Sequence, residues 1–136
     1  MAMFEYNATN LKLVSDTIVK HLNSDLLPKK WVERNKKNPM FGHCHTASAC
    51  LQKIFGGKNI KLYRALDDEG IWHWWAVDAK GTIIDLTADQ YYSEGKTPPW
   101  KNGEKAATLG FDYRKRVMKL LDKVTNELSS NGTPPQ

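Results

Sequence analysis

Two segments, one near each end of the chain, repeat apolar residues at the spacing that buries one face of a helix. The first covers about residues 10–23 and begins behind Asn10, which we place near the helix cap. The second begins near Asp112, and residues 129–136 after it are expected to form a flexible tail. The inward positions of this second helix are Val117, Leu120, Leu121, Val124 and Leu128.

In the middle of the chain, the sequence changes at Cys44 from a polar segment to a helical pattern. Residues 24–43 are polar and contain Pro and Gly, which predicts a long ordered loop, and loops of this length in compact domains are usually functional. A helical pattern then runs from about Cys44 to Phe55, where Gly56 and Gly57 end it. We therefore expect a buried helix whose first residue is a cysteine.

Three shorter segments, at about residues 60–66, 71–78 and 82–87, have the residue types and the alternation of strands. A loop is expected from Ser93 to Gly110. Short strands placed between helical segments indicate an α+β fold, with helices packed on a small antiparallel sheet. The length of 136 residues fits a single domain, which we expect to cover residues 1–128.

The composition of the chain indicates the cellular compartment in which we expect this domain. No apolar stretch approaches the roughly 18 residues of a membrane span, and the N-terminal residues lack the pattern of a signal peptide, so we expect a cytoplasmic protein without a membrane partner. The cysteines, Cys44 and Cys50, are six positions apart on one helix and point in different directions. They are expected to be free thiols, which indicates a reducing compartment.

The charge of the chain is modestly positive. A net charge of +5 permits attraction to a nucleic acid or an acidic protein, but the basic runs contain no recognisable nucleic-acid motif. Solvated surface is the favoured interpretation of these runs. They are Lys29-Lys30, Arg34-Asn35-Lys36-Lys37 and Arg114-Lys115-Arg116.

Cys44 is the strongest candidate for a catalytic residue. A helix N-terminus with a histidine nearby lowers the pKa of a thiol from about 8.5 into the range of roughly 3.5–7.5, and the thiolate is the nucleophile. His73 and Asp85 follow on two successive predicted strands, in the order that a Cys-His-Asp enzyme needs. Asp89 is a second choice for the carboxylate. Cys50 is better explained as a small buried hydrophobic residue.

The length of the turn between these two strands decides whether His73 and Asp85 can meet. With a two-residue turn Asp85 would pair with Ala76 and point away from His73. With a three-residue loop ending at Gly81 in the left-handed conformation, Asp85 pairs with Trp75 and His73 becomes its diagonal neighbour. Diagonal Cβ atoms lie about 7–8 Å apart, which lets an imidazole reach a carboxylate. The proposed triad therefore requires the three-residue loop.

The order of these elements resembles the papain-like and transglutaminase-like cysteine enzymes, and within them the small YunG-like bacterial proteins. This resemblance implies a papain-like core and the roles of nucleophile, base and orienting residue for Cys44, His73 and Asp85. One departure concerns His43, because the YunG-like pattern has Gly-Gln-Cys where this chain has Gly42-His43-Cys44. The matching strings are Asn38-Pro39-Met40-Phe41-Gly42-His43-Cys44, Phe55-Gly56-Gly57, His73-Trp74 and Ile84-Asp85-Leu86-Thr87-Ala88-Asp89-Gln90-Tyr91.

The expected chemistry is attack of the thiolate on an amide or ester carbonyl, giving a thioester, in a hydrolase, a deamidase or a transamidase. The substrate would be a protein, a peptide or a small amide, and no cofactor is implied. The backbone N–H of Cys44 is available as an oxyanion donor, and the indole of Trp31 is a second candidate. His43 and Trp75 are the remaining residues that we associate with the oxyanion or the substrate.

Two other functions compete with this one. His43, Cys44, His45 and His73 are all zinc-compatible, although three adjacent ligands differ from the usual spacing of zinc sites. A catalytically inactive, basic, Trp-rich module that binds a protein or a nucleic acid is the main alternative to the enzyme.

Overall fold

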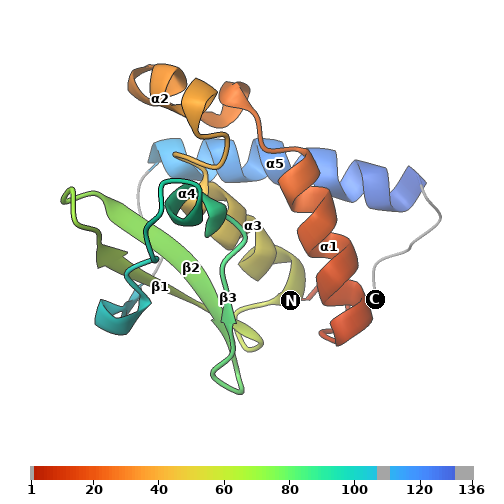
Figure 1. The fold of residues 1–136 in the computed structure, drawn as a ribbon. Helices are drawn as coiled ribbons and strands as arrows, with labels where there is room; N and C mark the ends of the chain where they lie inside the picture. The colour runs from red at the N-terminus through yellow and green to blue at the C-terminus, as the bar shows by residue number, and fades with distance from the viewer. Residues whose placement is uncertain (1, 107–110, 131–136) are drawn as a thin grey trace.

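The computed structural model describes residues 2–106 and 111–130 and has an α+β fold. A four-stranded antiparallel sheet lies against helix α3 (Cys44–Phe55), and α1 (Ala8–Lys20) and α5 (Phe111–Ser130) pack on that helix from the other side (Figure 1). Ten residues of α3 are buried, so this helix is the centre of the core. It begins at Cys44 and ends before Gly56, as the sequence predicts.

The two long terminal helices are confirmed with shifted ends. The cap of α1 is Asn7 rather than Asn10: the Asn7 side chain accepts a hydrogen bond from the backbone N–H of Asn10 at 2.8 Å. Every predicted inward position of α5 is buried. This helix continues through Ser129 and Ser130, which we expected in the tail, and residues 131–136 lie outside the described residues.

The prediction of a loop over residues 24–43 is wrong for much of its length. The segment contains two 3₁₀ turns, η1 (Ser24–Leu26) and η2 (Lys29–Trp31), followed by α2 (Val32–Lys37). Local capping forms the first turn, because the Asn23 side chain accepts from the N–H of Asp25 at 2.9 Å. Helices of three to six residues are too short to show an apolar period, which is why the sequence pattern misses them.

Three of the four strands were anticipated. The sheet has the order β3-β2-β1-β4 and is built from β1 (Ile60–Leu66), β2 (Trp72–Asp78), β3 (Ile83–Ile84) and β4 (Glu104–Ala106). The strand expected over 82–87 shrinks to β3, because the Asp85 side chain accepts from the N–H of Thr87 and turns the chain out of the sheet. The short edge strand β4 falls in a segment expected to be a loop.

The hairpin between β2 and β3 has the three-residue loop that the proposed triad requires. Ala76 pairs with Ile84 and Val77 with Ile83, and the N–H of Asp78 donates to the carbonyl of Thr82 at 3.0 Å. Gly81 has a φ of 86°, the left-handed conformation that this loop needs. The same register, continued by one residue, places Asp85 opposite Trp75.

Both faces of β2 are covered. On one face Trp74 packs edge-on against His45 of α3, with ring centroids 4.6 Å apart. On the other face His73 meets Tyr91 of the short helix α4 (Asp89–Tyr92). The chain then passes through the 3₁₀ turn η3 (Trp100–Asn102) to reach β4 at the opposite edge of the sheet (Figure 1). Within residues 2–106 and 111–130, no helix has both the length and the apolar character needed to cross a bilayer.

Candidate active site

His73 and Asp85 form a buried hydrogen-bonded pair. His73 Nε2 lies 2.6 Å from Asp85 Oδ2, and the two side chains are 0% and 2% exposed. The three-residue hairpin loop produces this contact, because it sets both residues on the same face of the sheet. The other carboxylate oxygen, Oδ1, accepts from the backbone N–H of Thr87 at 3.2 Å. The position of the carboxylate is therefore fixed by its own turn as well as by the histidine.

Trp100 completes the surroundings of Asp85, and sequence reasoning missed it. Its indole Nε1 donates to Asp85 Oδ2 at 2.8 Å, so this oxygen accepts from both an imidazole and an indole. The only sequence signal is a single tryptophan after Pro98 and Pro99 in a polar segment. That signal indicates an ordered turn but names no partner.

Cys44 is a near neighbour of His73. As the first residue of α3 it is 8% exposed, and its Sγ is 3.9 Å from the carbonyl oxygen of Trp72, the residue before His73. His73 Nδ1 is buried and has no hydrogen-bond partner among the described residues. Burial opposes a charge on His73, but the hydrogen bonds and charges of Asp85 and Cys44 outweigh it and raise the pKa of His73 to about 9. The arrangement therefore favours an imidazolium between the thiol and the carboxylate.

Two aromatic rings hold the imidazole of His73 in place. The Tyr91 ring meets it edge-on, with centroids 4.7 Å apart, and the hydroxyl of Tyr91 donates to Asp67 Oδ2 at 2.8 Å. Trp75 stacks on the imidazole at 5.7 Å with an interplanar angle of 27°. Because both rings are buried, His73 has little freedom to turn away from Cys44 and Asp85.

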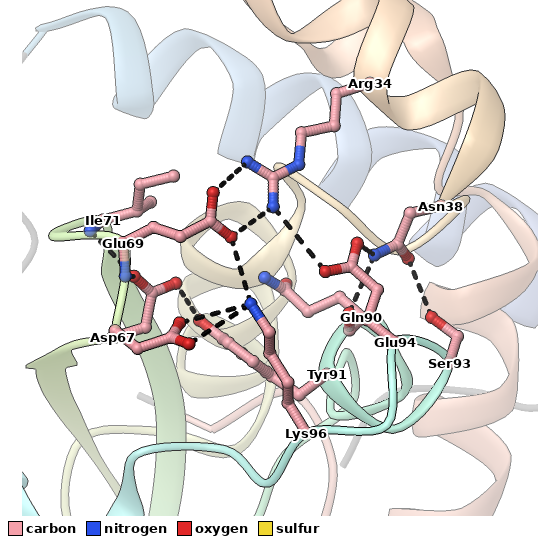
Figure 2. A network of polar contacts seen from close by, with 11 residues as sticks. Arg34, Asn38, Asp67, Glu69, Ile71, Gln90, Tyr91, Ser93, Glu94 and Lys96 are labelled. Atoms are coloured by element: carbon pink, nitrogen blue, oxygen red, sulfur yellow. Dashed lines mark hydrogen bonds and ion pairs between the residues drawn. The ribbon is translucent and has the colours of Figure 1, made fainter.

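A polar network ties three segments together around Asp67 and Tyr91 (Figure 2). Arg34 of α2 makes two hydrogen bonds to Glu69 in the turn between β1 and β2, at 3.0 and 2.7 Å. Lys96, in the segment after α4, reaches the same carboxylate at 3.5 Å. Exposed ion pairs contribute little stability one by one, but a bidentate arginine fixes geometry. The network thus sets the position of the turn that leads into β2.

Cys44 opens into a cavity of about 280 Å³. Aromatic side chains from three segments form much of its wall, while its polar lining includes the side chains of Gln90 and Arg116. The lining residues are Leu26, Pro28, Trp31, Phe41, Gly42, Cys44, His45, Thr46, Gly70, Ile71, Trp72, Trp74, Gln90 and Arg116.

The other residues that we associated with the oxyanion or the substrate occupy different places. Trp31 lines the cavity and packs edge-on against Phe41, with centroids 5.0 Å apart. Trp75 stacks on His73 and is not among the cavity-lining residues. His43 is fully buried outside that lining, and burial lowers its pKa to about 4. Its imidazole is therefore neutral at physiological pH, and neither ring nitrogen has a hydrogen-bond partner among the described residues.

The cysteines and histidines do not gather into a metal-binding group. In the part of the chain that the structure describes, no three His, Cys, Asp or Glu side chains come close enough to hold an ion together. Both cysteines are free thiols. Cys50 is completely buried, and its burial raises the pKa of its thiol to about 12. Only Cys44 combines a helix N-terminus, a cavity and a neighbouring imidazole.

Comparison with known proteins adds one finding. A family model described as YunG protein matches residues 12–129 of the chain, a range that includes Cys44, His73 and Asp85. No curated protein and no solved structure gives a significant match.

Proposed function

This chain belongs to the YunG family, and we propose that it is a cysteine-dependent acyl-transfer enzyme with a papain-like core. One observation carries the proposal: a buried imidazole is bonded through Nε2 to Asp85, and the Cys44 thiol is near enough to the same ring to raise the pKa of His73. The pairing makes Cys44 the nucleophile, His73 the base and acid, and Asp85 the residue that orients the ring.

The first half-reaction is attack of the Cys44 thiolate on the carbonyl carbon of an amide or ester. A C–S bond forms, the C–N or C–O bond breaks, and the imidazolium of His73 gives its proton to the leaving nitrogen or oxygen. The product is a thioester on Cys44. Water or an amine then attacks the thioester, His73 accepts a proton, and the thiolate leaves to restore the enzyme. Hydrolysis, deamidation and transamidation differ only in the substrate and in this second nucleophile.

We assign two N–H groups to the oxyanion of the tetrahedral intermediate. The backbone N–H of Cys44, at the first position of α3, is not used by the internal hydrogen bonds of that helix. The indole of Trp31 belongs to the same cavity. A protein, a peptide or a small amide is the substrate class, because each presents a carbonyl carbon to the thiolate.

Acylation by p-nitrophenyl acetate tests the proposal, with the acetyl adduct measured by intact mass and located by peptide mapping. Cys44→Ser should abolish the adduct, and Asp85→Asn should slow its formation by about 100-fold or more. Asp89→Asn is the matched control, because Asp89 is an exposed aspartate of α4 and should leave the rate unchanged. If Cys44→Ser and Asp85→Asn behave like the wild type, the inactive binding module replaces the enzyme as the function of this chain.

A further inference from the structure

We infer that the cavity beside Cys44 binds a small carboxylate whose apolar body carries an amide N–H, the chemistry shared by an N-acyl amino acid and the C-terminal residue of a peptide. This inference deepens the proposed function and rests on it for the fate of the bound amide. The binding itself depends on three features of the cavity: its walls, a cation and a buried acceptor.

The walls favour a small apolar or aromatic body. Four aromatic residues line the cavity: Trp31, Phe41, Trp72 and Trp74. Binding pockets for drug-sized ligands span about 300–1,000 Å³, so a volume of about 280 Å³ accommodates only a small molecule or one residue of a larger one. Such a site takes a single side chain rather than an extended chain.

Arg116 gives the cavity a positive charge. Among the described residues, no Asp or Glu lines the cavity and none makes an ion pair with Arg116. The neighbouring His45 is neutral at physiological pH, because burial and the charge of Arg116 lower its pKa to about 4. A guanidinium beside apolar walls binds a carboxylate through charge-assisted hydrogen bonds. The ligand is therefore expected to carry the negative charge that the described lining residues do not supply.

The side-chain oxygen of Gln90, Oε1, is a hydrogen-bond acceptor that receives no hydrogen bond from the described residues. The residue is 6% exposed, and its Oε1 has no partner among the described residues. Its backbone is held, because Asn38 Nδ2 donates to the Gln90 carbonyl at 2.8 Å (Figure 2). A buried acceptor without a donor is unfavourable, and an N–H group of the ligand would remove that cost. With the carboxylate at Arg116 and the N–H at Gln90, the adjoining carbonyl occupies the same small cavity as Cys44.

The experiment uses Cys44→Ala protein, so that no probe can react, and measures binding by isothermal titration calorimetry. The probes are N-acetyl-L-phenylalanine and its uncharged primary amide. We expect the carboxylate to bind at least about tenfold more tightly, and Arg116→Gln to remove that preference. Lys115→Gln is the matched control, because it deletes the same charge at an exposed neighbouring position of α5. It should change either affinity by no more than about twofold.

A third probe tests Gln90. N-acetyl-N-methyl-L-phenylalanine lacks the N–H, so it should bind more weakly than the parent compound. This difference should vanish in Gln90→Leu, where the acceptor is gone. The proposal is overturned if carboxylate and amide bind equally, if Arg116→Gln and Lys115→Gln have the same effect, or if the N-methyl penalty persists in Gln90→Leu. The melting temperature of each variant verifies that it is folded before binding is measured.

A tetrapeptide ending in phenylalanine separates the two sources of this chemistry. Binding as tight as that of N-acetyl-L-phenylalanine supports a peptide C-terminus, and loss of binding with the longer probe supports a free N-acyl amino acid. Because Cys44→Ala protein cannot be acylated, these affinities are independent of the acylation experiment. Failure of the carboxylate preference and failure of Cys44 acylation are therefore distinguishable.

Discussion

Trp100 donates its indole N–H to Asp85 at 2.8 Å, on the same oxygen that accepts from His73. Together with the N–H of Thr87 on the other oxygen, this gives the carboxylate three hydrogen-bond donors from three parts of the chain. Such a carboxylate cannot rotate without breaking at least one charge-assisted bond. The geometry of the imidazole therefore depends on Trp100, which acts on it through Asp85.

Replacement of Trp100 by phenylalanine should slow acylation of Cys44 by about tenfold while the fold persists, because one hydrogen bond to a charged group is lost. The measurement is the rate of acetyl adduct formation. If Trp100 acts only through Asp85, Trp100→Phe should add almost nothing in an Asp85→Asn background. Additive losses in the double variant would show that Trp100 acts through another contact.

The pKa of His73 should depend on both Asp85 and Cys44. In the wild type the ring should titrate near pH 9, as followed by NMR of the imidazole protons. Asp85→Asn and Cys44→Ser each remove an interaction that favours the imidazolium. Burial, which disfavours the charged ring, should then lower the pKa of His73 in each variant. An unchanged titration in Asp85→Asn would contradict the role of the carboxylate in stabilising the charge.

The two thiols should differ strongly in reactivity. Iodoacetamide near pH 6.5 should label Cys44, which opens into the cavity and adjoins His73, and should leave Cys50 unmodified in the folded protein. Peptide mass spectrometry after brief labelling gives the ratio, and urea-unfolded protein is the reference in which both thiols react. Equal labelling of the folded protein would rule out an activated Cys44.

The free energy of unfolding should decrease as the pH falls below about 6.5, because two buried histidines are neutral in the folded protein. Burial lowers the pKa of both His43 and His45 to about 4, whereas an unfolded histidine titrates near 6.5. The unfolded chain therefore takes up protons first as the pH falls from about 6.5 to about 4. Each histidine should lower the free energy of unfolding by up to about 3 kcal/mol over that window.

Urea unfolding at a series of pH values measures this loss. His43→Phe removes one titrating ring of similar size and should reduce the slope between pH 6.5 and 4 by about half. A slope that is the same in wild type and variant would show that His43 is protonated in the folded state.

Gly42 should resist substitution more strongly than Gly57. Its φ of 88° is strained for any residue with a Cβ, and an added Cβ would lie 2.8 Å from Cδ2 of Leu27. Gly42→Ala should cost about 1–3 kcal/mol of unfolding free energy. Gly57→Ala is the control, because nothing lies within 4 Å of its added Cβ. Equal midpoints in urea for the two variants would contradict this account.

The parts of the fold that could be predicted are those with local signals. The start of α3 follows from the change from a Pro/Gly segment to a helical pattern, and the register of the hairpin follows from Gly81 and the parity of a strand. These local signals are enough to select Cys44, His73 and Asp85 from the sequence. That the three residues catalyse acyl transfer stays a prediction.

The parts that could not be predicted depend on partners far away in the sequence. Trp100 acquires its role only by contacting Asp85, and the acceptor of Gln90 and the charge of Arg116 meet only across the cavity. The short helices between residues 24 and 43 have no periodicity to detect. The identity of a single residue carries no information about such contacts, so a sequence pattern cannot predict which residues make them.

The late position of Trp100 in the chain bears on the order in which the protein is made. During synthesis Cys44, His73 and Asp85 emerge before Trp100, and strand β4, which follows Trp100, pairs with β1 at the far edge of the sheet. A nascent chain that stops short of this crossing has all three chemical groups but lacks the indole that holds the carboxylate. The proposed nucleophile would therefore gain its full set of supporting contacts only when β4 joins the sheet.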